Sequence, residues 1–384
     1  MSKFSISVLL LMFSCGVIIA DDVTDGTELL FSLLIHRHGD RTPIESSLLL
    51  SNDPITLEAL SAPYGYGQLT DAGKTRAFAL GDYIGRRYSE LLAPRYNRSE
   101  VYIRSTDSTR TKMTILTALA SIYWPAEGTG WSDKINWEPV PYTTVPAKYD
   151  FNQGAMNCPT FTNYVYAEMF TPYPELSERY SEILALLSSK LGYNISNVPL
   201  IVSGVYDVYV SQLSLGLAID DDVAAVLDQI EELADISFDL LYGSDNYKKY
   251  QAGVLLNEFY TYSAQAIAGV DTQRLRIYSA HDVNVYAFEA VTEIENRQGA
   301  PKYASAYSLE VRRVTETGEI VVLPVYQPTP GTPEIYLQVK GCGNVLCNYD
   351  RFVEITSSNA LDEDTWRTEC GFTNDLVIDD SSVA

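Results

Sequence analysis

The sequence predicts an α/β fold: a three-layer sandwich in which helices flank a central mixed, mostly parallel sheet, with a smaller helical lobe inserted. Three short apolar segments, each followed by a polar turn, indicate buried strands. Segments with helical spacing follow the first two of them. The stretch 141–250 differs in character, with Pro, Tyr and Asn in loops and two amphipathic segments. We therefore assign 21–140 and 251–384 to the α/β core and 141–250 to the inserted lobe.

The first strand is expected at Leu29 to Ile35. This run is apolar apart from Ser32, as in a strand that is buried on both faces. It leads directly into a polar turn that contains Gly39 and Pro43. A buried strand that ends in such a turn is a common place for a functional site in an α/β protein.

The next elements follow from capping residues and spacing. Thr70 offers an N-cap for a helix that extends to about Leu92. Val101 to Ile103 predicts a second strand, and a helix through Met113 to Ala120 follows it. A third strand is expected at Leu275 to Tyr278. The polar turns after the three strands could share one edge of the sheet.

The remaining elements lie in the lobe and after it. Amphipathic helices are expected near Leu176 to Leu191 and Val223 to Leu241. Tyr307 to Val314 and Glu319 to Tyr326 predict a hairpin, because turn-forming residues join them. Pro324 lacks a backbone N–H and would suit only an edge position in the second of these strands.

The amino-terminal segment predicts secretion. Lys3 precedes the apolar run Val8 to Ile19, which ends at Ala20, the layout of a signal peptide at 1–20 that is cleaved. The run is too short for a comfortable bilayer span, although an uncleaved anchor is the alternative. We expect an extracellular protein without a membrane span, in preference to delivery to the lysosomal lumen.

The cysteines predict two disulfides. Cys15 lies in the signal peptide, and the other four cysteines are Cys158, Cys342, Cys347 and Cys370. An even number in an oxidising compartment is expected to pair, and the count alone allows three pairings. One closes a local loop between Cys342 and Cys347 and ties Cys158 to Cys370. The alternative, a zinc site, would need all four thiolates together or help from the three histidines.

The charge and the sequons fit an exported protein. With 384 residues, 46% of them hydrophobic, the chain can bury a large core. Without residues 1–20 it has 26 basic and 50 acidic residues and a charge of −24, which argues against nucleic acid and anionic membranes as partners. An anionic substrate must then be attracted by a local cluster of arginines. Asn97 and Asn194 each begin a glycosylation sequon.

The strongest signal for chemistry lies directly after the first strand, in the run Arg37-His38-Gly39-Asp40-Arg41-Thr42-Pro43. Two arginines flank a histidine here. Guanidinium groups are planar, permanently charged and able to bind phosphate oxygens in pairs. A neutral imidazole beside them can attack phosphorus, and the neighbouring cations disfavour its protonation. The run therefore predicts phosphoryl transfer through a histidine.

This run resembles the signature of the histidine acid phosphatases, in branch 2 of the histidine phosphatase superfamily. Four other segments are similar to that family, more specifically to the animal prostatic, lysosomal and venom acid phosphatases. They are Gly65 to Gly73, Tyr102 to Asp107, Asn157 to Pro159 and Tyr278 to Asp282. The resemblance extends from about Leu30 to Cys370.

The resemblance implies a role for each site residue. His38 would be the nucleophile, and Asp282 would protonate the leaving group and then activate water. The phosphate oxygens would be bound by Arg37, Arg41, Arg104 and His281. These groups can stabilise the transition state without a metal or another cofactor. The implied substrate is a small phosphomonoester, the implied activity is highest below neutral pH, and the relatives suggest a homodimer.

The resemblance also has departures. Many relatives have a third disulfide, for which this chain has no cysteines left, and hydroxyl residues where Val283 and Asn284 follow the His-Asp pair. Each site residue also has a structural alternative, since Arg104 could pair with Asp107 on the surface and His281 with its neighbour could cap a strand end. His36 is the remaining histidine, which we assign to packing.

Two other functions remain open at this point. A phytase or inositol polyphosphate phosphatase would share the Arg-His-Gly turn and the distal His-Asp pair, although such relatives tend to have longer chains and more cysteines. A secreted protein with this fold could instead act only by binding a ligand. Pseudoenzymes usually lose a nucleophile or a charged ligand, whereas all six positions are filled here.

Overall fold

The computed structural model describes residues 21–270 and 273–372 of the chain. The signal peptide expected at 1–20, which includes Cys15, lies outside the described residues. Among the helices of the described residues, none is long and apolar enough to cross a membrane.

The described residues contain one eight-stranded sheet with the order β3-β2-β4-β1-β5-β6-β7, and β8 pairs with β6. The strands are β1 (Thr27–Arg37), β2 (Val101–Thr106), β3 (Thr143–Val145), β4 (Leu275–Ala280), β5 (Ala306–Val314), β6 (Ile320–Gln327), β7 (Ile335–Tyr336) and β8 (Cys347–Asn348). β1 to β4 pair in parallel, whereas β5 pairs antiparallel with both β1 and β6. β6 therefore points the same way as β1 to β4, which confirms a mixed, mostly parallel sheet.

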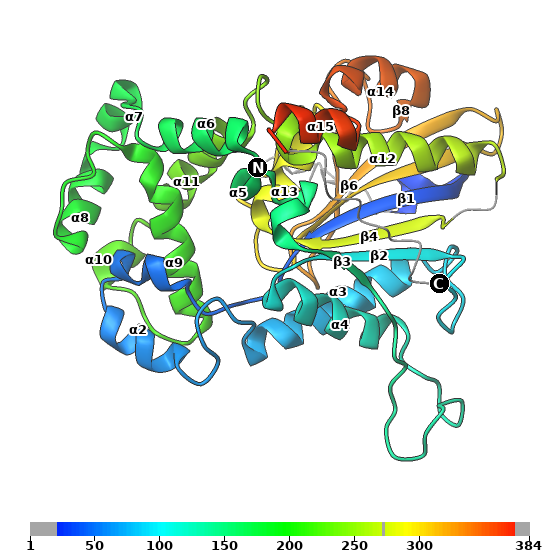
Figure 1. Ribbon diagram of the computed structural model, residues 1–384, viewed down its shortest axis with the longest axis horizontal. Coiled ribbons are helices and arrows are strands. Elements are labelled where there is room, and N and C mark those ends of the chain that lie inside the picture. Colours follow the sequence, from blue (N-terminus) through cyan, green and yellow to red (C-terminus); the bar gives the residue numbers. More distant parts are fainter. Residues whose placement is uncertain (1–20, 271–272, 373–384) are drawn as a thin grey trace, which may run out of the picture.

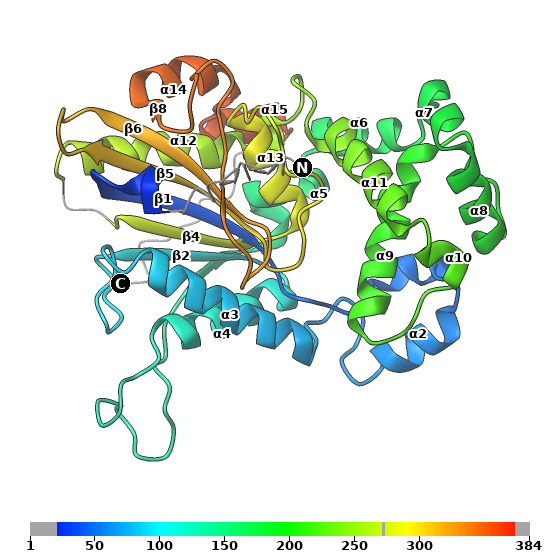
Figure 2. The same ribbon diagram turned by 180° about the vertical axis from the view of Figure 1, so that it is seen from behind.

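Helices cover both faces of this sheet (Figures 1 and 2). They are α3 (Asp71–Arg87), α4 (Thr109–Ile122), α12 (Lys249–Ile267), α13 (Asp282–Val291), α14 (Tyr349–Thr356) and α15 (Glu363–Glu369). α3 and α4 bury Leu80, Ile84 and Ile115 in one apolar core with β2 and β4. On the other face, Phe259 of α12 and Phe288 of α13 pack with β1 and β5 in a second core. The three-layer sandwich is confirmed.

The smaller lobe consists of helices, of which all but the first surround an apolar core of their own (Figure 1). They are α6 (Pro159–Met169), α7 (Pro174–Arg179), α8 (Ser181–Leu191), α9 (Val202–Ser214), α10 (Asp221–Ala224) and α11 (Leu227–Tyr242). The 3-10 helix η1 (Glu45–Leu50) contacts α9, and α2 (Pro54–Ser61) follows it on the same side of the molecule. A segment that precedes α3 in sequence thus packs with the lobe, while β3, within 141–250, belongs to the sheet.

Short helices complete the chain. They are α1 (Asp21–Thr24), η2 (Ala147–Tyr149), η3 (Phe151–Gln153), α5 (Gly154–Asn157), η4 (Pro199–Ile201) and η5 (Ser357–Asn359). The predicted strands and long helices are present, and Thr70 caps α3 by accepting a 3.1 Å hydrogen bond from the N–H of Gly73. Pro324 occupies a local edge of β6, because no ladder pair of β7 or β8 includes it. It lies between the residues that pair with β7 and those that pair with β8.

Both disulfides of the pairing considered above are present, with Cys158 bonded to Cys370 and Cys342 bonded to Cys347. The zinc alternative is therefore wrong, because all four thiols are consumed. The first bridge spans 212 positions and ties the start of α6 to the end of α15. The second closes a loop between residues only 5 positions apart.

Candidate active site

The ends of three parallel strands bring the two predicted catalytic turns together. In the sheet register, Arg37 of β1 lies opposite Ala280 of β4, and β4 also pairs in parallel with β2. The turn that contains His38 and the turn that contains His281 therefore leave the same edge of the sheet. Their imidazole rings are 5.6 Å apart between centroids.

The backbone of the first turn is fixed by its neighbours. The N–H of His38 donates to the Ala280 carbonyl at 3.1 Å, and its own carbonyl accepts from the N–H of Ala304 at 3.0 Å. Gly39 has no room for a side chain, because a Cβ there would lie 2.4 Å from the carbonyl oxygen of Gly73 in α3. The turn is thus held against both the sheet and the first turn of α3.

His38 is buried, and its hydrogen bonding fixes which nitrogen is free. Its Nδ1 lies 2.8 Å from the carbonyl oxygen of Gly39. Because a carbonyl only accepts, Nδ1 carries the proton, and Nε2 of the neutral ring keeps its lone pair. Burial and the charges of Arg110, Arg37 and Arg41 hold the pKa of His38 well below its ordinary value. Both effects favour the neutral form of the imidazole.

Arg37 and Arg41 are oriented by acceptors on their terminal nitrogens. Arg37 donates to the carbonyl of Pro301 at 2.7 Å, and it pairs with Asp282 at 2.7 Å and with Asp207 at 3.1 Å. Arg41 pairs with the other carboxylate oxygen of Asp207 at 2.7 Å. The Nε–H groups of both arginines are buried and have no partner among the described residues. Within the described residues, one buried donor of each guanidinium is thus left without a hydrogen bond.

Asp207 was not predicted as a site residue. It lies on α9 of the lobe, and no signal near it in the sequence connects it to the Arg-His-Gly turn. Its carboxylate bridges the two arginines that flank His38. The lobe therefore contributes directly to the site.

Arg110 is a second residue that the sequence analysis missed. It lies in the first turn of α4, and its guanidinium donates to Nδ1 of His281 at 3.2 Å. Its Nε is also buried without a partner among the described residues. Burial and the nearby charge of Arg41 lower the pKa of Arg110 to about 10. The position of Arg110, one turn beyond the polar end of β2, is the sequence signal that could have identified it.

Arg104 does not take the position that the resemblance assigned to it. Its guanidinium pairs with the buried Asp150 at 2.7 Å and lies 4.4 Å from the ring of Phe151. In the described part of the chain, no hydrogen bond or ion pair joins Arg104 to His38 or His281. The reason is its place on β2, two residues before the strand ends, roughly 7 Å short of the site edge. The alternative, a surface pair with Asp107, is also wrong.

His281 and Asp282 lie at the start of α13. Nδ1 of His281 accepts from Arg110, so Nε2 carries the proton and donates to Oγ1 of Thr106 at 3.0 Å. Burial and the charges of Arg110, Arg41 and Arg37 hold the pKa of His281 well below its ordinary value. The carboxylate of Asp282 pairs with Arg37 and is about one-fifth exposed, at 22%.

His36 is fully buried beneath the site, in agreement with the packing role that we assigned to it. Its Nδ1 lies 3.1 Å from the carbonyl oxygen of Arg37 and therefore donates to it. Burial lowers the pKa of His36 to about 4, which keeps this ring neutral as well.

Together, the fold and the site define a class of protein. A buried, neutral imidazole surrounded by guanidinium groups, at the carboxyl ends of parallel strands in a three-layer sandwich, is the layout of a phosphatase that uses a histidine. The family model of the histidine phosphatase superfamily (branch 2) matches residues 28–327. The chain belongs to this family.

Known relatives agree with this assignment. The chain is 32% identical to human prostatic acid phosphatase and 31% identical to the bovine protein, each over 354 residues, which are 90% of this chain and 89% of the relative. It is 29% identical to human lysosomal acid phosphatase over 90% of this chain and 81% of that protein.

Similar solved structures support the fold alone. The phytase of Klebsiella sp. ASR1 has a TM-score of 0.64 at 15% identity, and the match covers 92% of this chain and 99% of that one. The phytase of Hafnia alvei without ligand has a TM-score of 0.62 at 14% identity, with coverage of 90% and 98%.

Proposed function

We propose that this protein is a secreted acid phosphatase that hydrolyses phosphate monoesters through a phosphohistidine on His38. The observation that carries the proposal is the hydrogen bond from Nδ1 of His38 to the Gly39 carbonyl, which leaves Nε2 free among three guanidinium groups. The family of the chain and the names of its relatives support phosphomonoester hydrolysis.

In the first step, Nε2 of His38 attacks phosphorus while the bond from phosphorus to the leaving oxygen breaks. Negative charge develops on the leaving oxygen, and Asp282 in its acid form donates a proton to it, which releases an alcohol. The charge on the other three oxygens is stabilised by Arg37, Arg41 and Arg110, whose Nε–H groups lack partners in the described chain.

In the second step, water attacks the phosphohistidine. The Asp282 carboxylate accepts a proton from this water, the bond from phosphorus to Nε2 breaks, and inorganic phosphate leaves. His38 returns to its neutral form, and Asp282 is again an acid. His281 is proposed to help bind the phosphate, and its ring is already oriented by Thr106 and Arg110.

Secretion is the other part of the proposal. The layout of residues 1–20, the two disulfides and the exposure of both sequon asparagines, Asn97 and Asn194, support it. If it is correct, protein collected from the culture medium of eukaryotic cells begins after Ala20, and deglycosylation increases its mobility on a gel.

Rapid quenching with a phosphorus-labelled monoester tests the mechanism. The wild-type protein should form a phosphoprotein that is labile in acid and stable in base, and His38→Ala should not form it. Asp282→Ala should form it much more slowly with an alkyl phosphate. His36→Asn is a matched control, because His36 also donates from Nδ1 to the next carbonyl but lies beneath the site. Label that persists in His38→Ala would refute the proposal.

A further inference from the structure

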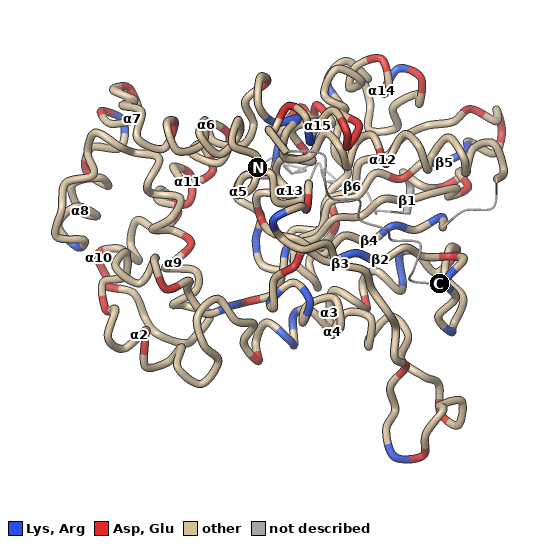
Figure 3. The backbone as a smooth tube through the Cα atoms, in the orientation of Figure 1, with Lys and Arg blue, Asp and Glu red and all other residues tan. Residues whose placement is uncertain are grey.

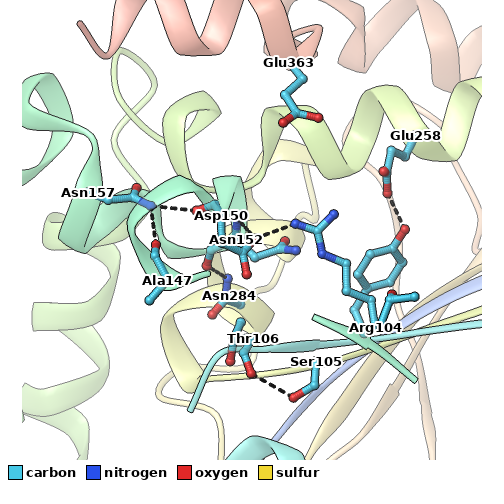
Figure 4. Close-up of polar contacts among 12 residues, drawn as sticks. Arg104, Ser105, Thr106, Ala147, Asp150, Asn152, Asn157, Glu258, Asn284 and Glu363 are labelled. Carbon is cyan, nitrogen blue, oxygen red and sulfur yellow. Dashed lines mark hydrogen bonds and ion pairs between the residues drawn. The ribbon is translucent and has the colours of Figure 1, made fainter. Parts of the chain in front are cut away.

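Arg104 is buried beside the site, although it does not contact the catalytic histidines. Figure 4 shows its guanidinium directed at Asp150, and both side chains are almost completely buried. Asp150 lies in the segment that links β3 to α5, far from β2 in sequence. A buried ion pair is costly unless its remaining groups are satisfied, so the other contacts of Asp150 show what the pair holds in place.

The first of these contacts leads to a backbone carbonyl. Oδ1 of Asp150, the atom that binds Arg104, also accepts from the N–H of Asn152 at 3.0 Å. The carbonyl of Asn152 in turn accepts from Nδ2 of Asn284 and, at 3.0 Å, from Nε2 of Gln251. The ion pair thereby fixes the short helix η3, in which the carbonyl of Asn152 faces α13 (Figure 4).

The series of hydrogen bonds continues from Asn284 to the turn that contains His281. Oδ1 of Asn284 accepts from the backbone N–H of His281 at 3.2 Å. Asn284 is 1% exposed, and both ends of its amide are therefore used, one for His281 and one for Asn152. Rotating the amide by half a turn would lose both bonds, so the side chain has a single favourable orientation.

We propose that Asn284 is a positioning residue that holds the first turn of α13, and that the Arg104–Asp150 pair anchors it through Asn152. This inference rests on the proposed function, because the residues it positions are His281 and Asp282. The carboxylate of Asp282 pairs with Arg37. Whether the carboxylate can reach this position depends on where the backbone of the turn lies. A small shift of that turn would misplace the proton donor.

The length of the Asn284 side chain allows it to make both bonds. A hydroxyl oxygen of Ser or Thr lies one bond closer to the backbone than the amide atoms of Asn. It can replace the acceptor for His281, but it cannot also reach the carbonyl of Asn152 without movement of the backbone. In this chain, the longer amide connects the catalytic turn to η3.

The test compares two substrates whose leaving groups differ in their need for a proton. β-Glycerophosphate releases a basic alkoxide and depends on Asp282, whereas p-nitrophenyl phosphate releases a stable phenolate and depends on it little. For Asn284→Ala, we expect kcat/KM to fall at least tenfold more with β-glycerophosphate than with p-nitrophenyl phosphate. Asn284→Thr, which retains an acceptor for His281, should recover part of this difference. Asp150→Asn should show the same selective loss.

Asn359→Ala is the matched control, because Asn359 is also a buried asparagine with two bonds, to Val291 and Glu293, away from the turn. This variant should not lower kcat/KM for one substrate more than for the other. An equal loss for both substrates in Asn284→Ala, or no loss, would overturn the inference, since an unfolded fraction reduces both rates alike. If Asn284→Ala does not fold, the same comparison of kcat/KM for the two substrates is made with Asn284→Thr. A wild-type protein that hydrolyses neither substrate would instead refute the proposed function.

Discussion

At the scale of single residues, each guanidinium around His38 is oriented through its terminal nitrogens, whereas its Nε–H group makes no hydrogen bond within the described residues. Arg37 and Arg41 use terminal nitrogens to bind Asp207, and Arg110 uses one to bind His281. Their Nε–H groups have no partner within the described residues. Orientation is thereby settled before a substrate arrives, which lowers the cost of reorganisation on binding.

The carboxylate of Asp207 should weaken anion binding while it orients the arginines. Replacing it by an amide in Asp207→Asn removes a negative charge beside the phosphate position but keeps an acceptor. We expect the inhibition constant of inorganic phosphate to fall by about three- to tenfold, or ~0.7–1.4 kcal/mol. Competitive inhibition measured at low salt tests this. Asp222→Asn is the control, since Asp222 pairs with Lys190 elsewhere in the lobe. Weaker phosphate binding would contradict the prediction.

The charge of Arg110 should set the acid limit of activity. A guanidinium disfavours the imidazolium form, and Arg110 is the largest charge effect that lowers the pKa of His38. In Arg110→Gln, the pKa of His38 should rise, so activity is lost at a higher pH as the solution is acidified. We expect the acid limb of kcat/KM to move upward by on the order of one pH unit. Arg86→Gln, an exposed arginine of α3 paired with Asp82, should leave the limb unchanged.

At the scale of elements, the site depends on how closely α3 approaches the catalytic turn. Thr70, its N-cap, donates its backbone N–H to the carbonyl of Asp40 at 2.9 Å. A Cβ on Gly73 would lie 2.1 Å from the same carbonyl oxygen, and one on Gly39 would meet Gly73. The helix therefore begins in direct contact with the loop that contains His38.

Two glycines of α3 make a matched pair for testing this contact. Gly73→Ala should destabilise the protein by about 2 kcal/mol and reduce activity, because the loop must move to admit the methyl group. Gly85→Ala has only an ordinary contact at 3.6 Å, with Ile122, and should stabilise the helix by up to ~1 kcal/mol. Denaturant unfolding of both variants measures the difference. Equal stability of the two would contradict the prediction.

Secondary-structure elements could be predicted from the sequence better than the contacts between side chains of different elements. Strand β1 and the cap of α3 follow from local patterns, namely apolar runs and a capping threonine. Asp207 could not be predicted, because its partners are about 170 positions away and on another lobe. The resemblance pointed to Arg104, which lies within β2 and pairs with Asp150, whereas Arg110, just beyond the strand, contacts His281. Only the backbone path shows which arginine reaches the turn.

At the scale of the whole molecule, the site is a cationic cluster in an acidic protein. The chain has 27 basic and 50 acidic residues and a net charge of −23. Acidic residues are spread over the lobe and the outer helices (Figure 3). Over distances beyond roughly 10 Å, this field acts on a substrate mainly at low ionic strength. The lobe contributes to the field even at the site itself, through Asp207.

This charge distribution should favour simple monoesters over polyanions. Phytate brings several phosphates, of which the arginine cluster can bind one, while the others meet Asp207 and the acidic surroundings. We expect kcat/KM for p-nitrophenyl phosphate to exceed that for phytate by about tenfold or more at low salt. Added salt should narrow the ratio, because screening weakens the repulsion of phytate more than the short contacts around one phosphate. Phosphate release measured over a range of salt concentrations tests both parts. A preference for phytate at low salt would indicate the phytase alternative instead, despite the acid phosphatase relatives.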